Sequence, residues 1–100
     1  MLTFEKVLDV FGDYLAKDKS HEVLSTSRGC LVVNWENCEH DWVTAQLCRT
    51  PVDLRDVLRF GYVERQSFFL TDGYMRDLAE QEEQDIERMG LGLAARCEEK

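Results

Sequence analysis

The sequence predicts an α+β fold: a three-stranded antiparallel meander sheet packed on one face by helices, in the order αβββαα. Apolar residues recur at helical spacing near both ends of the chain. Short segments of alternating polarity lie between them, from residue 22 to residue 48. A Thr-Pro pair at positions 50 and 51 then marks the start of a second helical region. We expect the 100 residues to form a single domain, 1–100.

The first predicted helix spans residues 3–17, and Thr3 is its expected N-cap. Its apolar stripe faces the core and consists of Phe4, Val7, Leu8, Phe11 and Leu15. Three strands follow, at residues 22–27, 30–36 and 42–48. Arg28 and Gly29 form the first turn, either as a tight primed turn or with a glycine-containing bulge.

Side chains alternate between the two faces of a strand, so each face can be assigned from the sequence. Pairing Trp35 with Val43 places Cys30 opposite Cys48. Alternation and pairing place one set of residues together on the face that we expect to be the core face: Leu24, Thr26, Leu31, Val33, Trp35, Val43, Ala45 and Leu47. The outer face then comprises Val23, Cys30, Val32, Trp42 and Cys48, and it is unexpectedly apolar.

The next helix is predicted at residues 51–70. Thr50 caps it, Pro51 takes the first helical position and Asp53 lies near the positive end of the dipole. We expect this helix to continue through Gly61 rather than break there. The third helix is predicted at residues 74–89, ended by Gly90 and Gly92, with a loose tail at 91–100.

Charge is the most unusual feature of the composition. Twenty acidic residues and twelve basic residues give a net charge of −8. This sign disfavours direct binding to nucleic acid and favours a partner with a basic protein surface. No apolar run is long enough to span a membrane, and the N-terminal residues do not resemble a signal peptide. We therefore expect a cytoplasmic protein with no membrane partner.

Four residues could ligate zinc: Cys30, Cys38, His40 and Cys48. In the predicted hairpin, Cys30 and Cys48 lie at one end and the other two at the far end, over about 15 Å away. We therefore expect no metal site, no cofactor and no catalytic residue. The remaining alternative is a small thiol enzyme that uses Cys38 and His40.

The predicted partner-binding residues are acidic. On the third helix, Glu80, Glu83 and Glu87 lie at i, i+3 and i+7. Their spacing of about 5–6 Å is close to that of phosphates along a nucleic acid strand. The flanking residues are Glu82 and Asp85, and a second cluster at the hairpin tip comprises Glu36, Glu39 and Asp41. Such surfaces can occupy a groove built for nucleic acid.

In element order, length and acidity, the chain resembles the small type II anti-CRISPR proteins of phages and mobile genetic elements. That resemblance implies an inhibitor that mimics DNA on a nucleic-acid-binding effector such as Cas9, at the site that reads the PAM. The alternative is a homo-oligomeric interaction module, a homodimer formed through the apolar outer sheet face.

Overall fold

The structure is a computed structural model that describes residues 2–18, 20–37 and 42–98, with the backbone alone at residues 36–37 and 42–43. Within these residues, four helices and three strands follow one another. They are α1 (Phe4–Val10), α2 (Gly12–Lys17), β1 (His21–Thr26), β2 (Gly29–Asn37), β3 (Trp42–Cys48), α3 (Pro51–Leu70) and α4 (Glu80–Arg96). The strand order β1-β2-β3 and the antiparallel pairing confirm the predicted α+β class and meander.

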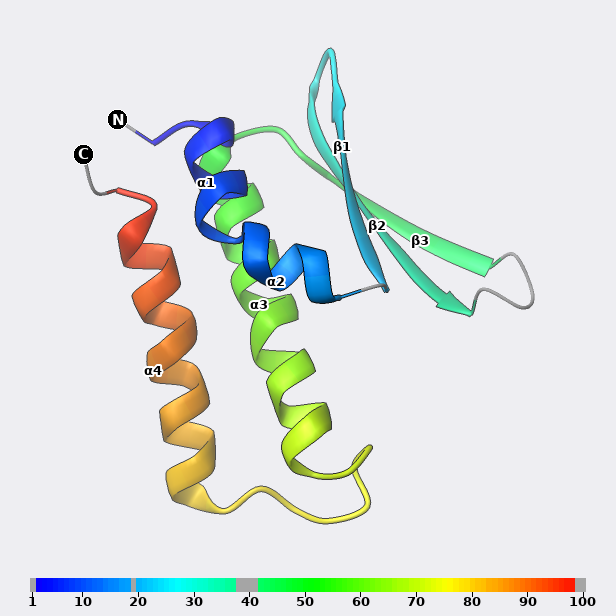
Figure 1. Cartoon of the computed structure of the whole chain (residues 1–100). Helices are drawn as coiled ribbons and strands as arrows, with labels where there is room; N and C mark the ends of the chain where they lie inside the picture. The colour runs from blue at the N-terminus through cyan, green and yellow to red at the C-terminus, as the bar shows by residue number, and fades with distance from the viewer. Residues whose placement is uncertain (1, 19, 38–41, 99–100) are drawn as a thin grey trace.

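The elements are arranged side by side around α3 (Figure 1). Helices α3 and α4 form an antiparallel hairpin, and α1 and α2 pack across α3. The sheet lies on the other side of α3 from α4 (Figure 1). The main core is therefore built between the helices and one face of the sheet, around the fully buried side chains of Val7, Phe11 and Leu54.

The predicted helix at residues 3–17 is two helices, and this is a correction. Thr3 caps α1 as expected, because its hydroxyl accepts a hydrogen bond from the Lys6 amide at 3.1 Å. The helical path breaks at Phe11, whose backbone has φ −90° and ψ 6°. Gly12 follows directly, and glycine weakens helix continuation. The break changes the direction of the chain while both Phe11 and Tyr14 remain buried.

Pairing within the sheet follows the predicted register over most of its length. Cys30 lies opposite Cys48, as predicted, and the same register continues to Asn34. A β-bulge or irregularity then shifts the pairing by one residue, so that Asn37 pairs with Trp42. At the first turn, Gly29 has φ +132°, and a Cβ there would lie 2.3 Å from the Cys48 carbonyl oxygen. Only glycine fits this position.

The predicted assignment of the two sheet faces is wrong. The helices cover the face that carries Cys30, Val32 and Cys48, which are 3%, 4% and 0% exposed. Leu24 and Trp35, which were expected in the core, are 44% and 38% exposed on the opposite face. Both faces are apolar, so alternation alone could not decide between them. The covered face has the smaller side chains, and these leave room for bulky residues contributed by the helices.

Helix α3 has the predicted bounds and continues through Gly61. Thr50 caps it through a 3.2 Å hydrogen bond from the Asp53 amide. The predicted helix at residues 74–89 is displaced, because residues 71–76 form turns, residues 77–79 are irregular and α4 begins at Glu80. Asp72, Gly73 and Tyr74 all have positive φ, which a helix cannot accommodate.

The predicted loose tail is also corrected, since α4 extends through Arg96. Gly90 and Gly92 lie inside this helix and do not end it. Gly90 is buried where α4 meets α3, and a Cβ at this position would lie 3.0 Å from Val63 Cγ2. Gly90 therefore permits the close approach of the two helices.

Candidate functional site

Five of the predicted partner-binding residues lie in the first half of α4, from Glu80 to Glu87. Their contacts divide them into two groups. Glu80, Glu83 and Glu87 are exposed. Glu80 accepts a 3.5 Å hydrogen bond from Gln84, and none of the three forms an ion pair with the described residues. Glu80 and Glu83 also lie in the first helical turn, where carboxylates stabilise the helix dipole.

Glu82 and Asp85 have local partners instead. Glu82 binds Arg76 through two 3.0 Å hydrogen bonds and accepts a third from the Ala79 amide. The Arg76 guanidinium, more than the amide, lowers the pKa of Glu82 to about 2. Asp85 accepts a hydrogen bond from Gln81 and lies 3.6 Å from Arg88. Glu82 therefore holds the start of α4 in place rather than facing a partner.

The second predicted acidic cluster cannot be placed. Glu39 and Asp41 lie outside the described residues, and Glu36 is described by its backbone alone. The same holds for Cys38 and His40, the residues of the thiol-enzyme alternative. The roles expected of the hairpin-tip acids and of Cys38 and His40 therefore remain predictions.

The face of the sheet turned away from the helices is a broad apolar surface. Leu24 pairs with Leu31, and Leu31 pairs with Leu47, so three leucines form a row across the three strands. Trp35 lies on the same face, four residues further along β2 than Leu31, and donates a 3.2 Å hydrogen bond to Glu22. The face that was expected to form a homodimer carries Cys30, Val32 and Cys48, and the helices cover it, so that prediction is wrong about the face. From here on, the outer sheet face means the opposite surface, with the residues Leu24, Leu31, Val33, Trp35, Ala45 and Leu47, of which Val33 is buried among its neighbours. An uncovered surface of this kind is typical of a protein interaction site.

A buried polar cluster lies between α2, β1 and α3, and sequence reasoning missed it. Its centre is Asp18, which is 4% exposed. One carboxylate oxygen accepts hydrogen bonds from the Tyr14 hydroxyl at 2.7 Å and lies 2.9 Å from His21 Nδ1. The other accepts from the Ser20 amide at 2.9 Å and lies 3.8 Å from Arg65. His21 is therefore a partner of Asp18.

Electrostatics favour the ionised form of Asp18. Burial by itself would raise its pKa, but hydrogen bonds from Tyr14, Ser20 and His21 together lower it below the usual value. Burial, reinforced by Asp18, raises the pKa of Tyr14, so its hydroxyl remains a donor. The i, i+4 spacing of Tyr14 and Asp18 was the available signal, but the sequence does not reveal that a carboxylate here is buried. The cluster fixes the path from α2 into β1.

In the described part of the chain, the thiols form no candidate catalytic site and the possible metal ligands form no candidate metal site. Cys30 and Cys48 are buried and free, and burial raises the pKa of Cys48. Buried neutral thiols are poor nucleophiles. Among the residues that the structure describes, no group of three or more His, Cys, Asp or Glu side chains could hold a metal ion.

Comparison with known proteins adds no relative: no protein-family model, curated protein or solved structure matches the chain. Across the described ranges, none of the helices is long and apolar enough to cross a membrane. The class of protein is thus defined by the fold alone, as an acidic α+β protein with one face of its sheet uncovered.

Proposed function

We propose that this is a partner-binding protein, without catalytic activity, that acts through the outer sheet face, and that the partner on this face is a second copy of the chain. The observation that carries the proposal is the leucine row across all three strands, with Leu24 44% exposed. Burying such a surface contributes about 25 cal/mol for each Å² of apolar area removed from water. A cytoplasmic location would keep the buried thiols reduced.

The charge distribution supports a second copy as the occupant. The chain carries a net charge of −8, so two copies repel one another over most of their surfaces. On the outer sheet face, Glu22 is the charged residue among the described strand positions, and Trp35 donates a hydrogen bond to it. Two such faces can meet with little repulsion between like charges.

The two ends of the sheet differ in charge, which favours a two-fold arrangement. Arg28 and Arg49 are exposed at the end where Thr26 pairs with Gly29. Glu22 lies toward the other end, about 15 Å away at roughly 3.3 Å per residue. A two-fold axis that lies between the two outer sheet faces and runs perpendicular to the strands would bring the basic end of one copy toward Glu22 of the other.

Sedimentation equilibrium of the wild-type protein and two lysine variants tests the proposal. Leu24 and Val52 are both 44% exposed, but Leu24 lies on the outer sheet face and Val52 lies on α3. We expect the wild type and Val52→Lys to approach twice the 11.7 kDa mass of one chain at high micromolar concentration. Leu24→Lys should remain at the mass of one chain. A monomeric wild type, or a dimeric Leu24→Lys, would refute the proposal.

A second function is favoured by the exposed carboxylates of α4. Helix α4 lies on the opposite side of α3 from the sheet (Figure 1), so a dimer through the outer sheet face would leave this helix and its exposed residues Glu80, Glu83 and Glu87 accessible. We propose that they contact a basic groove on a nucleic-acid-binding effector such as Cas9. This is the inhibitory role implied by the resemblance to anti-CRISPR proteins.

An assay of DNA cleavage by a Cas9-type effector tests this second function. The wild type should inhibit cleavage, and replacement of Glu80, Glu83 and Glu87 by lysine should abolish inhibition. The control replaces three other exposed acids, Glu5, Asp9 and Glu64, with lysine, which changes the net charge equally. If both triple variants lose inhibition together, only net charge matters. If the wild type does not inhibit, this function is excluded, while the dimer proposal stands.

A further inference from the structure

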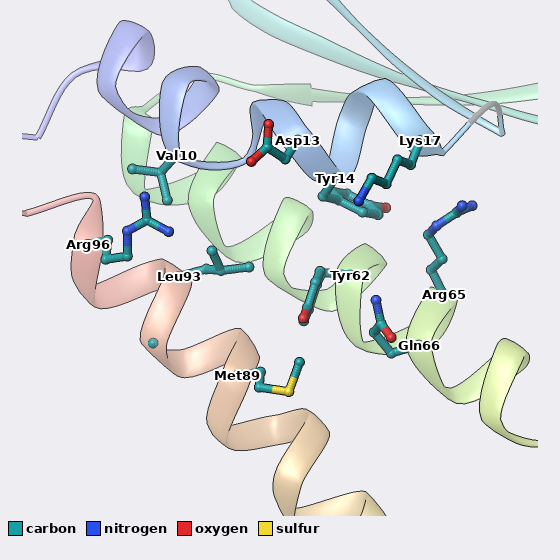
Figure 2. Close-up of a pocket in the computed structure, with 11 residues that line it drawn as sticks. Val10, Asp13, Tyr14, Lys17, Tyr62, Arg65, Gln66, Met89, Leu93 and Arg96 are labelled. Atoms are coloured by element: carbon teal, nitrogen blue, oxygen red, sulfur yellow. The ribbon is translucent and has the colours of Figure 1, made fainter.

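A cavity of about 470 Å³ lies between the first two helices, α3 and α4, away from the outer sheet face. Figure 2 shows α2 above it, α4 below it and α3 behind. This volume is in the range of sites that hold small molecules. The lining is Val10, Asp13, Tyr14, Lys17, Tyr62, Arg65, Gln66, Met89, Gly92, Leu93 and Arg96.

The charge of this lining is opposite to that of the whole chain. Three cations, Lys17, Arg65 and Arg96, line the cavity with a single carboxylate, Asp13. The chain as a whole has twenty acidic and twelve basic residues. Arg65 is engaged, since it lies 3.8 Å from Asp18 and 4.6 Å from the Phe69 ring centre. Lys17 and Arg96 form no ion pair with the described residues.

The lining gives the cavity one polar side and one side where apolar residues lie beside the Arg96 side chain. Lys17, the Gln66 amide and the Tyr62 hydroxyl come from α2 and α3 on one side of the view (Figure 2). Leu93, Val10 and the Arg96 side chain occupy the other side, with Met89 at the lower edge (Figure 2). Met89 is 50% exposed, so an apolar ligand would shield it from water.

We propose that this cavity binds a small amphipathic anion, a carboxylate with an apolar body. The carboxylate pairs with the Lys17 ammonium and accepts hydrogen bonds from Gln66 and Tyr62. The apolar body packs against Tyr62, Leu93 and Met89. Burial raises the pKa of Tyr62, so its hydroxyl is a donor at neutral pH. This proposal is independent of the dimer, because the lining residues come only from helices.

Isothermal titration calorimetry with decanoate tests the site, and decyltrimethylammonium is the probe of opposite charge and similar chain. Decanoate should bind the wild-type protein with a stoichiometry of one per chain, and the cation should bind at least about tenfold more weakly. Lys17→Glu should weaken decanoate binding by about tenfold or more. The matched control is Arg88→Glu, because Arg88 is exposed on α4 outside the cavity, and it should change the affinity less than about twofold.

Two further variants locate the ligand. Met89→Glu should weaken decanoate binding, because it places a carboxylate beside the apolar body. Leu24→Lys, which tests the outer sheet face, should bind decanoate as tightly as the wild type does. Equal binding of both probes, no effect of Lys17→Glu, or loss of binding in Leu24→Lys would each overturn the proposal. Absence of decanoate binding at millimolar concentration would overturn it as well.

Discussion

At the scale of the residue, Asp18 makes the most consequential set of contacts in the described chain. Its carboxylate joins α2 to β1 through Tyr14, Ser20 and His21. A buried carboxylate is tolerated here because its hydrogen bonds replace the water it loses. The burial of Asp18 could not be predicted from the sequence, since it follows a helix end where acidic residues are ordinarily solvated.

We expect Asp18→Asn to destabilise the protein by about 2–3 kcal/mol at pH 7, because hydrogen bonds to a charged group are lost. The folded-state pKa of Asp18 is lowered, so its contribution is fully present above the unfolded value of about 4. It is lost as pH falls through the lowered pKa. Urea denaturation should thus show a difference between wild type and variant that shrinks as the pH falls into the acid range.

Asp9→Asn is the control for this prediction, because Asp9 is exposed on α1. It should change the free energy of unfolding by less than about 0.5 kcal/mol. A variant Asp18→Asn that is as stable as the wild type at pH 7 would contradict the account. So would a difference in stability that grows in acid.

At the scale of the element, the sheet contains both an accurate prediction, its register, and a wrong one, its buried face. Strand alternation and the Cys30–Cys48 register could be predicted, since a slip of one residue reverses every side chain. The buried face could not be predicted, because it depends on the size of the side chains that the helices pack against the sheet. Likewise, the Thr50-Pro51 signal fixed the start of α3, but no comparable signal marks the start of α4.

The corrected face assignment predicts unequal effects of two alanine substitutions. Val32→Ala removes buried methyl groups beside the helices and should cost about 2 kcal/mol. Leu24→Ala, on the outer sheet face, should cost less than about 1 kcal/mol at protein concentrations low enough to avoid association. Urea denaturation measures both. The reverse order would mean that the helices cover the other face.

The two glycines of α4 give a second matched pair. Gly92→Ala places its Cβ in open space and should stabilise the helix by up to about 1 kcal/mol. At Gly90 the new Cβ would lie 3.0 Å from Val63 and 3.3 Å from Arg59. Overpacking then offsets the gain in helix stability. We expect Gly90→Ala to leave the free energy of unfolding unchanged or to lower it by up to about 2 kcal/mol. Thermal denaturation compares them; equal stabilisation by both would show that α3 and α4 are not closely packed at Gly90.

At the scale of the whole molecule, the acidic start of α4 and the outer sheet face lie far apart. The exposed acids of α4 lie on one side of α3 and the outer sheet face lies on the other (Figure 1). The sequence indicated the acidic helix directly, since i, i+3 and i+7 positions share one side of any helix. It could not indicate the cavity, whose lining joins residues from separate helices that only the tertiary fold brings together.

Acrylamide quenching of Trp35 fluorescence during dilution tests the central claim most directly, in a Trp42→Phe variant that retains Trp35 as its single tryptophan. Trp35 is 38% exposed in one copy and lies on the outer sheet face. If two copies meet there, quenching should be weak at high concentration and should increase as the dimer dissociates. Quenching that is unchanged over the whole dilution series would contradict the claim that this face is the interface.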